Sequence, residues 1–580
     1  MEKLKNLIRV INKEKFYIIS LLLIIGLGYY LRVMGLNKFA LTDDETYCYY
    51  LAKQAFPVGI LKTIFNQDIH TPLYFFILHF WMKFFGESDI VLRFLSVIFG
   101  VLNIPVGYLI GKELLSKKAG LLMAAFISIN SLLIYYSQEV KFYSMLPLLV
   151  SLSLLFILKI KNNKEKNSLY NYAGLVISNL ILLFTFTFGF IFVFFEALFF
   201  LVYFFKKKDF KPFLYAQLIT FGLFLPYLIF FMIHHIVVYS NAFFDIIPWE
   251  GNLNISNIVT CIQDMFSPVL IALMKSPFSG YFSIFITKLF NPLFFIIVMI
   301  PIIIYFIGIE RGLTSKNTFV TLSFLTGASF IGVEVILTLA GKFGIMPRYT
   351  ILALIPFIIT ACYGLAVMKN KPLQKTLIVF FIVINLFYLL AIPDSAQRLP
   401  RNGKGKVIAN LLDKYNISNN DIVLLPPYGR SVNKYLSDKI NDLIYFDVLR
   451  SNSIKMLLGE KLTATLNKNN SYNVFKDYVA YSEPSQALDK YIKNNIVKKL
   501  DKSGHFIIVL DKDIAIFGRK EIEYQLYQDP YAFYPYKSQS MFFMLYSKAL
   551  NDFLITGKKY LKLVKIEKSG LFEIYIFEKR

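Results

Sequence analysis

A series of long apolar segments between residues 16 and 392 constrains the fold of this chain more than any other feature. A helix of about 20 apolar residues is needed to cross the roughly 30 Å hydrocarbon core of a bilayer. The chain is 56% hydrophobic with a mean hydropathy of +0.54, an excess that indicates an apolar solvent. Eleven segments are long enough to cross: 16–36, 91–111, 119–136, 143–160, 169–187, 188–205, 213–236, 281–308, 318–340, 350–368 and 373–392. The sequence therefore predicts an all-α polytopic membrane bundle over residues 1–393.

A twelfth apolar segment, Pro72–Phe85, is too short to cross a bilayer. We predict a helix that lies in the membrane interface or re-enters the bilayer from one side. It falls within residues 37–90, between the first two predicted crossings, which the prediction treats as the first outer loop.

The distribution of positive charge tests the count of crossings. With eleven crossings and a cytoplasmic N-terminus, the inner loops carry 21 Lys and Arg residues, whereas the longer outer loops carry 9. Cytoplasmic loops of membrane proteins are enriched in Lys and Arg. If Pro72–Phe85 crossed the bilayer, the lysine clusters after it would lie on the outer side of the membrane. The charges therefore favour eleven crossings. An odd number places residues 394–580 outside the cytoplasm.

The formal net charge of +24 does not indicate a nucleic-acid partner. The lysines lie in short clusters between apolar segments, as at Lys206–Lys208, which is the arrangement that orients a membrane protein. The three cysteines are far apart and have no metal-site spacing. We therefore expect the lipid bilayer, and no nucleic acid, as a partner.

The predicted topology gathers the polar residues that could perform chemistry on the outer face. Ionisable groups at the edge of the hydrocarbon are costly unless they are paired or hydrated. Each has a plainer interpretation, because an acidic cluster can be a solvated loop and a lone Arg can be an interface anchor. The candidates are Asp43, Asp44, Glu45, His70, Arg93, Glu139, Lys141, Arg348 and Tyr349.

The segments around these residues resemble a known family. Their sequences, in this order, are similar to motifs of bacterial glycosyltransferases of the dolichyl-phosphate-mannose protein mannosyltransferase-like group, glycosyltransferase family 39, which includes the aminoarabinose transferases. The resemblance covers roughly residues 40–150 and, less fully, 340–370. The segments that carry it are Leu41–Tyr47, His70–Trp81, Leu92–Gly100, Tyr136–Tyr143 and Pro347–Pro356.

The resemblance implies a multi-span GT-C fold and a polyprenyl-phosphate sugar as donor. The family's Asp-Glu pair corresponds to Asp44 and Glu45, with Asp43 as the alternative if the register differs by one. The chain departs from the family at two positions. Thr71 replaces the first of two prolines, and Lys141 replaces the arginine of a Glu-x-Arg motif, which loses bidentate phosphate geometry.

Sugar transfer from a lipid phosphate needs a base on the acceptor side and cations beside the leaving phosphate. We expect Asp44 to be the general base and the reaction to invert the anomeric centre, because no second carboxylate is evidently placed as a nucleophile. The candidates for holding the phosphate are Lys141, Arg93, Arg348 and His70. A divalent metal that bridges Asp44 or Glu139 to the phosphate is compatible with this superfold, but the sequence does not require it.

Residues 394–580 have the composition of a water-facing domain, with 30 basic and 20 acidic residues. Hydrophobic patterning predicts helices at 407–415 and 431–437, and strands at 421–425, 505–510, 513–517 and 571–577. We expect a small extracytoplasmic α/β domain whose role stays open among capping the active site, binding the acceptor and contacting lipid head groups.

Two other functions fit parts of the sequence. A transporter or flippase for lipid-linked glycans would share the bundle, but it would be expected to place polar residues near the midplane. A non-catalytic scaffold leaves the polar residues on one face without a shared purpose. We predict a multi-pass enzyme of the plasma membrane whose acceptor is a glycan, a lipid or a protein, because the Lys-, Asn- and Ile-rich composition suggests a prokaryotic source.

Overall fold

The computed structural model describes most of the apolar region and parts of the C-terminal region. The described residues are 2–36, 40–67, 70–162, 168–234, 265, 292–339, 347–391, 404–414, 421–425, 442–445, 489, 492–498, 500, 504–511, 557–569 and 572–580. By their contacts the residues form two units. The first comprises 1–38, 48–237 and 253–400, and the second comprises 39–47, 238–252 and 401–580.

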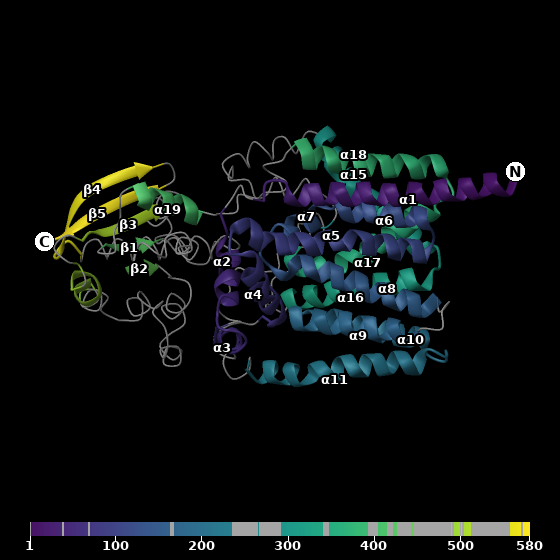
Figure 1. Ribbon diagram of the computed structural model, residues 1–580, viewed down its shortest axis with the longest axis horizontal. Helices are drawn as coiled ribbons and strands as arrows, with labels where there is room; N and C mark the ends of the chain where they lie inside the picture. The colour runs from purple at the N-terminus through teal and green to yellow at the C-terminus, as the bar shows by residue number, and fades with distance from the viewer. Residues whose placement is uncertain are drawn as a thin grey trace. The chain divides into compact units, whose positions relative to one another are not determined.

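The first unit is a bundle of long apolar helices that run alongside one another (Figure 1). A helix occurs at each of the eleven predicted positions. In chain order these are α1 (Glu2–Val33), α5 (Asp89–Leu114), α6 (Lys117–Ile129) with α7 (Ser131–Ser137), α8 (Met145–Asn162), α9 (Ser168–Thr185), α10 (Gly189–Phe204), α11 (Phe210–His234), α15 (Pro292–Thr314), α16 (Thr318–Leu339), α17 (Pro347–Val367) and α18 (Lys371–Ala391).

Length and apolar composition identify six of the described helices as membrane-spanning, or seven if a bent pair counts as one span. Helices α9 and α10 are apolar but shorter. Large apolar side chains lie on the surface of the bundle. Leu23 and Val202, for example, are each 70% exposed. An apolar exterior of this kind is expected where lipid is the solvent.

The third predicted crossing is broken rather than continuous. Helices α6 and α7 meet at an angle of 58° at Asn130. The Asn130 side chain accepts a hydrogen bond from the Leu133 amide and so caps α7. The predicted crossing 119–136 therefore ends in a separate short helix.

Tight packing between α15 and α17 depends on glycine. A Cβ atom on Gly364 of α17 would lie 1.9 Å from the Gly308 carbonyl oxygen of α15. Small residues of this kind allow two membrane helices to approach backbone to backbone. The two helices consequently form one of the closest contacts in the bundle.

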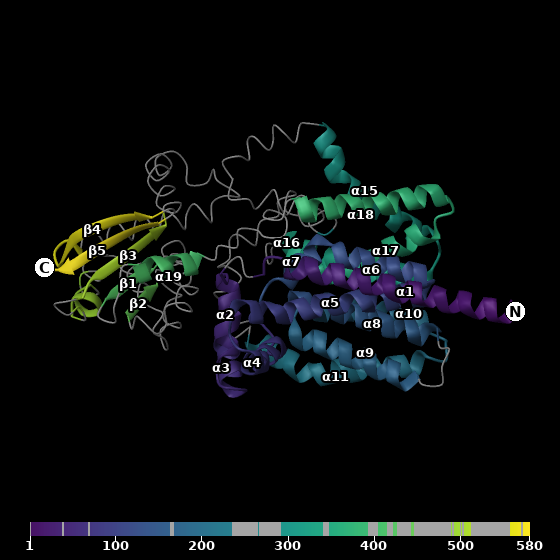
Figure 2. The ribbon, with the colours of Figure 1, turned by 45° about the horizontal axis from the view of Figure 1, so that its top comes forward.

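The region predicted as the first outer loop is largely helical. It contains α2 (Asp43–Ala52), α3 (Val58–Gln67) and α4 (Leu73–Phe85), the last at the predicted short helix. Helix α3 lies crosswise at one end of the long helices in both views (Figure 2). It buries Ile60 and Ile64, one helical turn apart, and exposes Val58.

The second unit contains a five-stranded mixed sheet and the helix α19 (Lys404–Lys414), which buries Ile408 and Leu412. The strand order is β2-β1-β3-β5-β4. Strands β2 (Asp442–Tyr445), β1 (Ile422–Leu425) and β3 (Phe506–Asp511) are parallel, whereas β5 (Phe572–Lys579) runs antiparallel to β3 and to β4 (Leu561–Ser569).

The helix and three strands predicted at 407–415, 421–425, 505–510 and 571–577 correspond to α19, β1, β3 and β5. Strands β2 and β4 were not predicted. The elements predicted at 431–437 and 513–517 lie outside the described residues. The α/β character of the C-terminal region is confirmed by the mixed sheet and its helix.

Candidate active site

A cluster of aromatic rings joins parts of the chain that the sequence placed on one face of the bundle. The His70 ring, just before α4, lies 5.4 Å from the Phe142 ring of the 3-10 turn η1 (Phe142–Ser144). Phe142 lies 5.5 Å from Phe186, in the turn between α9 and α10. Phe186 in turn stacks on Tyr349, in the first turn of α17, at 6.3 Å. Four separate segments therefore meet through adjacent rings.

The same cluster contains a cation. The Arg348 guanidinium carbon lies 4.9 Å from the centroid of the Tyr349 ring, and both side chains are half-buried. Tyr136, at the end of α7, interacts electrostatically with both Arg348 and Glu139. Two predicted site residues, Glu139 and Arg348, are therefore brought close to a common neighbour. Charges in such a poorly hydrated setting interact more strongly than charges in water.

Helix α5 holds the backbone next to this cluster. The hydroxyl of Ser96 donates to the Lys141 carbonyl at 3.2 Å, and the Lys141 amide donates to the Glu139 carbonyl at 2.8 Å. Arg93, three residues before Ser96, donates from Nη1 to the Leu36 carbonyl at 2.9 Å. The Lys141 and Arg93 side chains are both buried. Because one guanidinium donor of Arg93 serves Leu36, fewer of its donors are left for a ligand.

The acidic cluster begins α2 and forms a capping box. The Thr42 amide donates to Glu45 Oε2 at 2.9 Å, and the Glu45 amide donates to Thr42 Oγ1 at 3.2 Å. This reciprocal pair is the capping-box arrangement of a Thr-x-x-Glu sequence. Glu45 is 1% exposed, whereas Asp44 is exposed. A structural role thus accounts for Glu45, and Asp44 has the accessibility that an acid–base group needs. Asp43 belongs to the same first turn.

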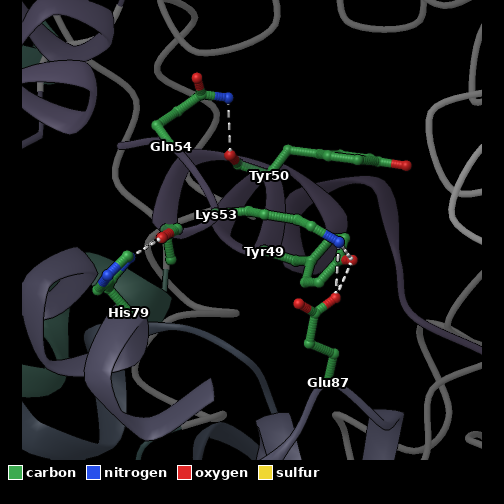
Figure 3. Close-up of polar contacts among 7 residues, drawn as sticks. Tyr49, Tyr50, Lys53, Gln54, His79 and Glu87 are labelled. Carbon is green, nitrogen blue, oxygen red and sulfur yellow. Dashed lines mark hydrogen bonds and ion pairs between the residues drawn. The ribbon is translucent and has the colours of Figure 1, made fainter. Parts of the chain in front are cut away.

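The second half of α2 is fastened by side chains (Figure 3). Tyr49 and Lys53 both donate to Glu87 Oε2, just before α5, and Lys53 Nζ lies 2.8 Å from both the Glu87 oxygen and the Tyr49 hydroxyl. His79 Nδ1 of α4 lies 2.7 Å from the Ala52 carbonyl. Burial and the bond to Glu87 raise the pKa of Tyr49, and the bond to Glu87 raises that of Lys53. These contacts fasten the C-terminal end of α2 to α4 and to the residue just before α5.

Sequence reasoning missed some of the residues that build this region. Phe186 and Phe188 lie in a turn without charged residues, and Phe188 also contacts Tyr349, with ring centroids 6.0 Å apart. No cluster of three or more potential metal ligands occurs in the part of the chain that the structure describes.

Sequence comparison matches one family. Its description is dolichyl-phosphate-mannose-protein mannosyltransferase, and the match covers residues 69–230. This segment contains His70, Arg93, Glu139 and Lys141, so the match supports the resemblance seen in the motifs. None of the curated proteins matches the chain.

Solved structures with a similar fold cover nearly the whole chain. Apo ArnT from Cupriavidus metallidurans has a TM-score of 0.55 and 8% identity, with coverage of 96% of this chain and 97% of ArnT. ArnT bound to undecaprenyl phosphate has a TM-score of 0.51 and 10% identity, with the same coverage.

An archaeal structure is also similar. The Archaeoglobus fulgidus oligosaccharyltransferase, tethered to an acceptor peptide, has a TM-score of 0.50 and 13% identity, with coverage of 97% of this chain and 74% of that protein. At such low identities the likeness shows a shared fold. The expected GT-C fold is therefore confirmed.

Proposed function

We propose that this chain, a multi-pass membrane protein with a GT-C fold, is a glycosyltransferase that moves a sugar from a polyprenyl-phosphate-linked donor to an acceptor outside the cytoplasm. The match to a mannosyltransferase family over residues 69–230 supports the reaction class. The structure of ArnT with undecaprenyl phosphate supports the donor class. The acceptor is a glycan, a lipid or a protein, and the tethered peptide of the archaeal relative is one precedent.

The observation that carries the proposal is the meeting of cationic and aromatic residues at His70, Phe142, Tyr349 and Arg348. A polyprenyl phosphate leaves as an anion, so the enzyme must stabilise negative charge as the glycosidic bond breaks. Arginine is suited to phosphate because its donors form a planar fork. The Tyr349 ring beside the half-buried guanidinium shields it in part from water, which strengthens its attraction to the phosphate.

We propose that Arg348 and Lys141 bind the donor phosphate and that His70 donates a further hydrogen bond to it. Arg93 has a supporting role. Glu139 interacts electrostatically with Tyr136, as Arg348 does, and we propose that its carboxylate orients the cations. Tyr349 positions Arg348 through its ring. If a divalent metal takes part, Asp44 and Glu139 are the residues that we expect to hold it, and it would supply further positive charge to the phosphate.

On the acceptor side we assign the general base to Asp44. The acceptor oxygen attacks the anomeric carbon, its proton passes to the Asp44 carboxylate, and the carbon–oxygen bond to the phosphate breaks. One displacement of this kind inverts the anomeric configuration. No acid is needed for the leaving group, because the phosphate departs with its negative charge.

The experiment is a binding titration of undecaprenyl phosphate to the purified chain in nanodiscs, followed by native mass spectrometry. A lost charge-assisted hydrogen bond costs about 1.5–3 kcal/mol, or roughly 10- to 150-fold in affinity. Arg348→Gln is expected to weaken binding by at least about tenfold. Arg311→Gln is the matched control, since Arg311 is exposed in the last turn of α15. Equal affinities in all three proteins would contradict the assignment.

A flippase would also bind the lipid phosphate, so transfer is measured as well. The assay supplies polyprenyl-phosphate sugars and follows the release of sugar-free lipid phosphate. Release that depends on an added acceptor supports the transferase. Movement of intact donor across the bilayer, without release, would favour the flippase.

A further inference from the structure

The guanidinium of Arg32 is completely buried near the end of the first membrane-spanning helix. Arg32 is 0% exposed. Its Nη1 donates to the carbonyls of Gly28 at 2.9 Å and Ser128 at 3.0 Å, and its Nη2 donates to the Ile127 carbonyl at 3.1 Å. A fully buried cation within a membrane-spanning segment is costly and usually has a functional reason.

These bonds account for the break between α6 and α7. The last carbonyls of a helix have no partner within the helix, and an unsatisfied carbonyl in hydrocarbon is expensive. The carbonyls of Ile127 and Ser128 belong to the last turn of α6. Arg32 supplies donors to both. A side chain from α1 therefore allows the third span to end early and the chain to turn into α7.

A second set of hydrogen bonds runs from the residue after α7 back to the end of α1. Gln138, just after α7, donates from Nε2 to the carbonyls of Leu31, Arg32 and Met34 at 3.1–3.3 Å. These carbonyls lie at and just beyond the end of α1. The Arg32 Nε also donates to Ser137 Oγ at 3.2 Å. Gln138 consequently caps the end of α1, while Arg32 of α1 caps the end of α6 and binds the Ser137 side chain at the end of α7.

The surrounding backbone leaves just enough room for this arrangement. A Cβ atom on Gly100 of α5 would lie 2.1 Å from Ser137 Oγ and 2.8 Å from Arg32 Nε. Real side chains do not approach so closely, so any residue other than glycine would displace Arg32 or Ser137. We call Arg32, Ser137, Gln138 and Gly100 the cross-cap.

We propose that Arg32 is a positioning residue that, through the cross-cap, sets the place of residues 138–141 and thereby of Glu139 and Lys141 beside the donor phosphate. The inference rests on the proposed function. The role assigned to Arg32 is indirect, because its Nε, Nη1 and Nη2 donate to Ser137, Gly28, Ser128 and Ile127 of the protein itself. Lys141 follows Gln138 by three residues, and Ser96 fixes its carbonyl.

Arg93 of α5 holds the backbone just beyond the end of α1, because its Nη1 donates to the Leu36 carbonyl at 2.9 Å. Gln138 and Arg93 together therefore fix the backbone that follows α1 as far as Leu36.

The test uses Gly100→Ala, with Gly26→Ala as the matched control. A Cβ atom on Gly26 meets nothing within 4 Å, and both changes add the same methyl group to a helix. Arg32→Met is a second variant that removes the donors directly. Each protein is purified in nanodiscs and compared by thermal unfolding, by donor KM and kcat, and by hydrogen exchange of the peptide 138–144.

We expect Gly100→Ala to speed exchange in 138–144 and to raise the donor KM at least about fivefold, with the acceptor KM unchanged. Gly26→Ala is expected to match the wild type. A merely structural role would lower the unfolding temperature but leave the donor KM of the folded protein unchanged. Wild-type exchange and donor KM in Gly100→Ala would overturn the proposal. Absence of transfer by the wild type would instead contradict the proposed function.

Discussion

The capping box at Thr42 and Glu45 gives a direct way to separate structure from chemistry at the acidic cluster. Glu45→Gln keeps a side-chain oxygen that can accept from the Thr42 amide but removes the negative charge. Glu45→Ala removes the acceptor. If Glu45 caps α2, the two variants differ strongly. If Glu45 acts as a carboxylate in the reaction, both variants lose activity.

The structure sets the size of the effect. Loss of a capping side chain costs about 1 kcal/mol, in the range 0.5–2. Glu45 is 1% exposed, so water does not readily replace its oxygen at the Thr42 amide. A buried donor left without a partner adds to the cost. We expect Glu45→Ala to destabilise the first turn of α2 by about 1.5 kcal/mol. This lowers the ratio of ordered to disordered first turns by roughly tenfold.

The assay is hydrogen exchange of the peptide that begins at Thr42, measured together with sugar transfer. For Glu45→Ala we expect exchange about tenfold faster in the first turn of α2 and a matching loss of transfer. For Glu45→Gln we expect exchange and transfer within about twofold of the wild type, because amide oxygens also serve in capping boxes. An inactive Glu45→Gln protein with wild-type exchange would refute the reasoning and make Glu45 a reacting group.

Three further predictions follow from packing and charge. Gly364→Val should lower the stability of the bundle by about 2 kcal/mol or more, because a Cβ atom there would lie 1.9 Å from the Gly308 carbonyl oxygen. Gly332→Val should not lower it, because a Cβ atom on Gly332 meets nothing within 4 Å. Thermal unfolding in detergent compares the two variants. Glu87→Gln should cost at most about 1 kcal/mol in unfolding free energy, since its ion pair with a lysine is half-exposed. Burial and the bond to Glu87 raise the pKa of Tyr49, so the stability from its neutral hydroxyl is complete below the ordinary tyrosine pKa and is lost as pH rises through the raised value. Glu87→Gln should lower the pKa of Tyr49, which difference absorbance against Tyr49→Phe would measure.

Hydropathy was sufficient to locate the helices of the bundle, because spanning segments must satisfy their backbone within each helix. It could not locate the break at Asn130. That break depends on Arg32, which lies far away in the sequence and supplies the donors that the freed carbonyls need. The continuous apolar pattern of residues 119–136 does not predict such a partner.

Helices α2 and α3 were missed for a different reason. Residues 37–71 are mixed in polarity, and a helix of ten residues has few turns in which to display a period. The amphipathic α3 is formed by burying one face against the bundle, which is a tertiary effect. In the C-terminal region, β4 escaped prediction because it lies at the edge of the sheet and leaves Leu563, Val564 and Ile566 exposed.

The candidate site was predictable as a set of residue types but not as an arrangement. Motifs and topology identified His70, Glu139, Lys141 and Arg348. The rings that connect His70 to Arg348 include Phe186, which lies in a turn with no polar signal. Apolar residues that build a polar site resemble ordinary core residues in the sequence, so only the fold distinguishes them.

The most direct test of the account is mass spectrometry of surface glycans and lipid-linked sugars from cells that express the wild-type chain or Asp44→Asn. The account predicts that one sugar-sized increment disappears from an acceptor in the variant while its polyprenyl-phosphate donor accumulates. Unchanged profiles in a well-expressed variant, together with altered profiles when the wild-type chain is removed, would contradict the assignment of Asp44 as the base.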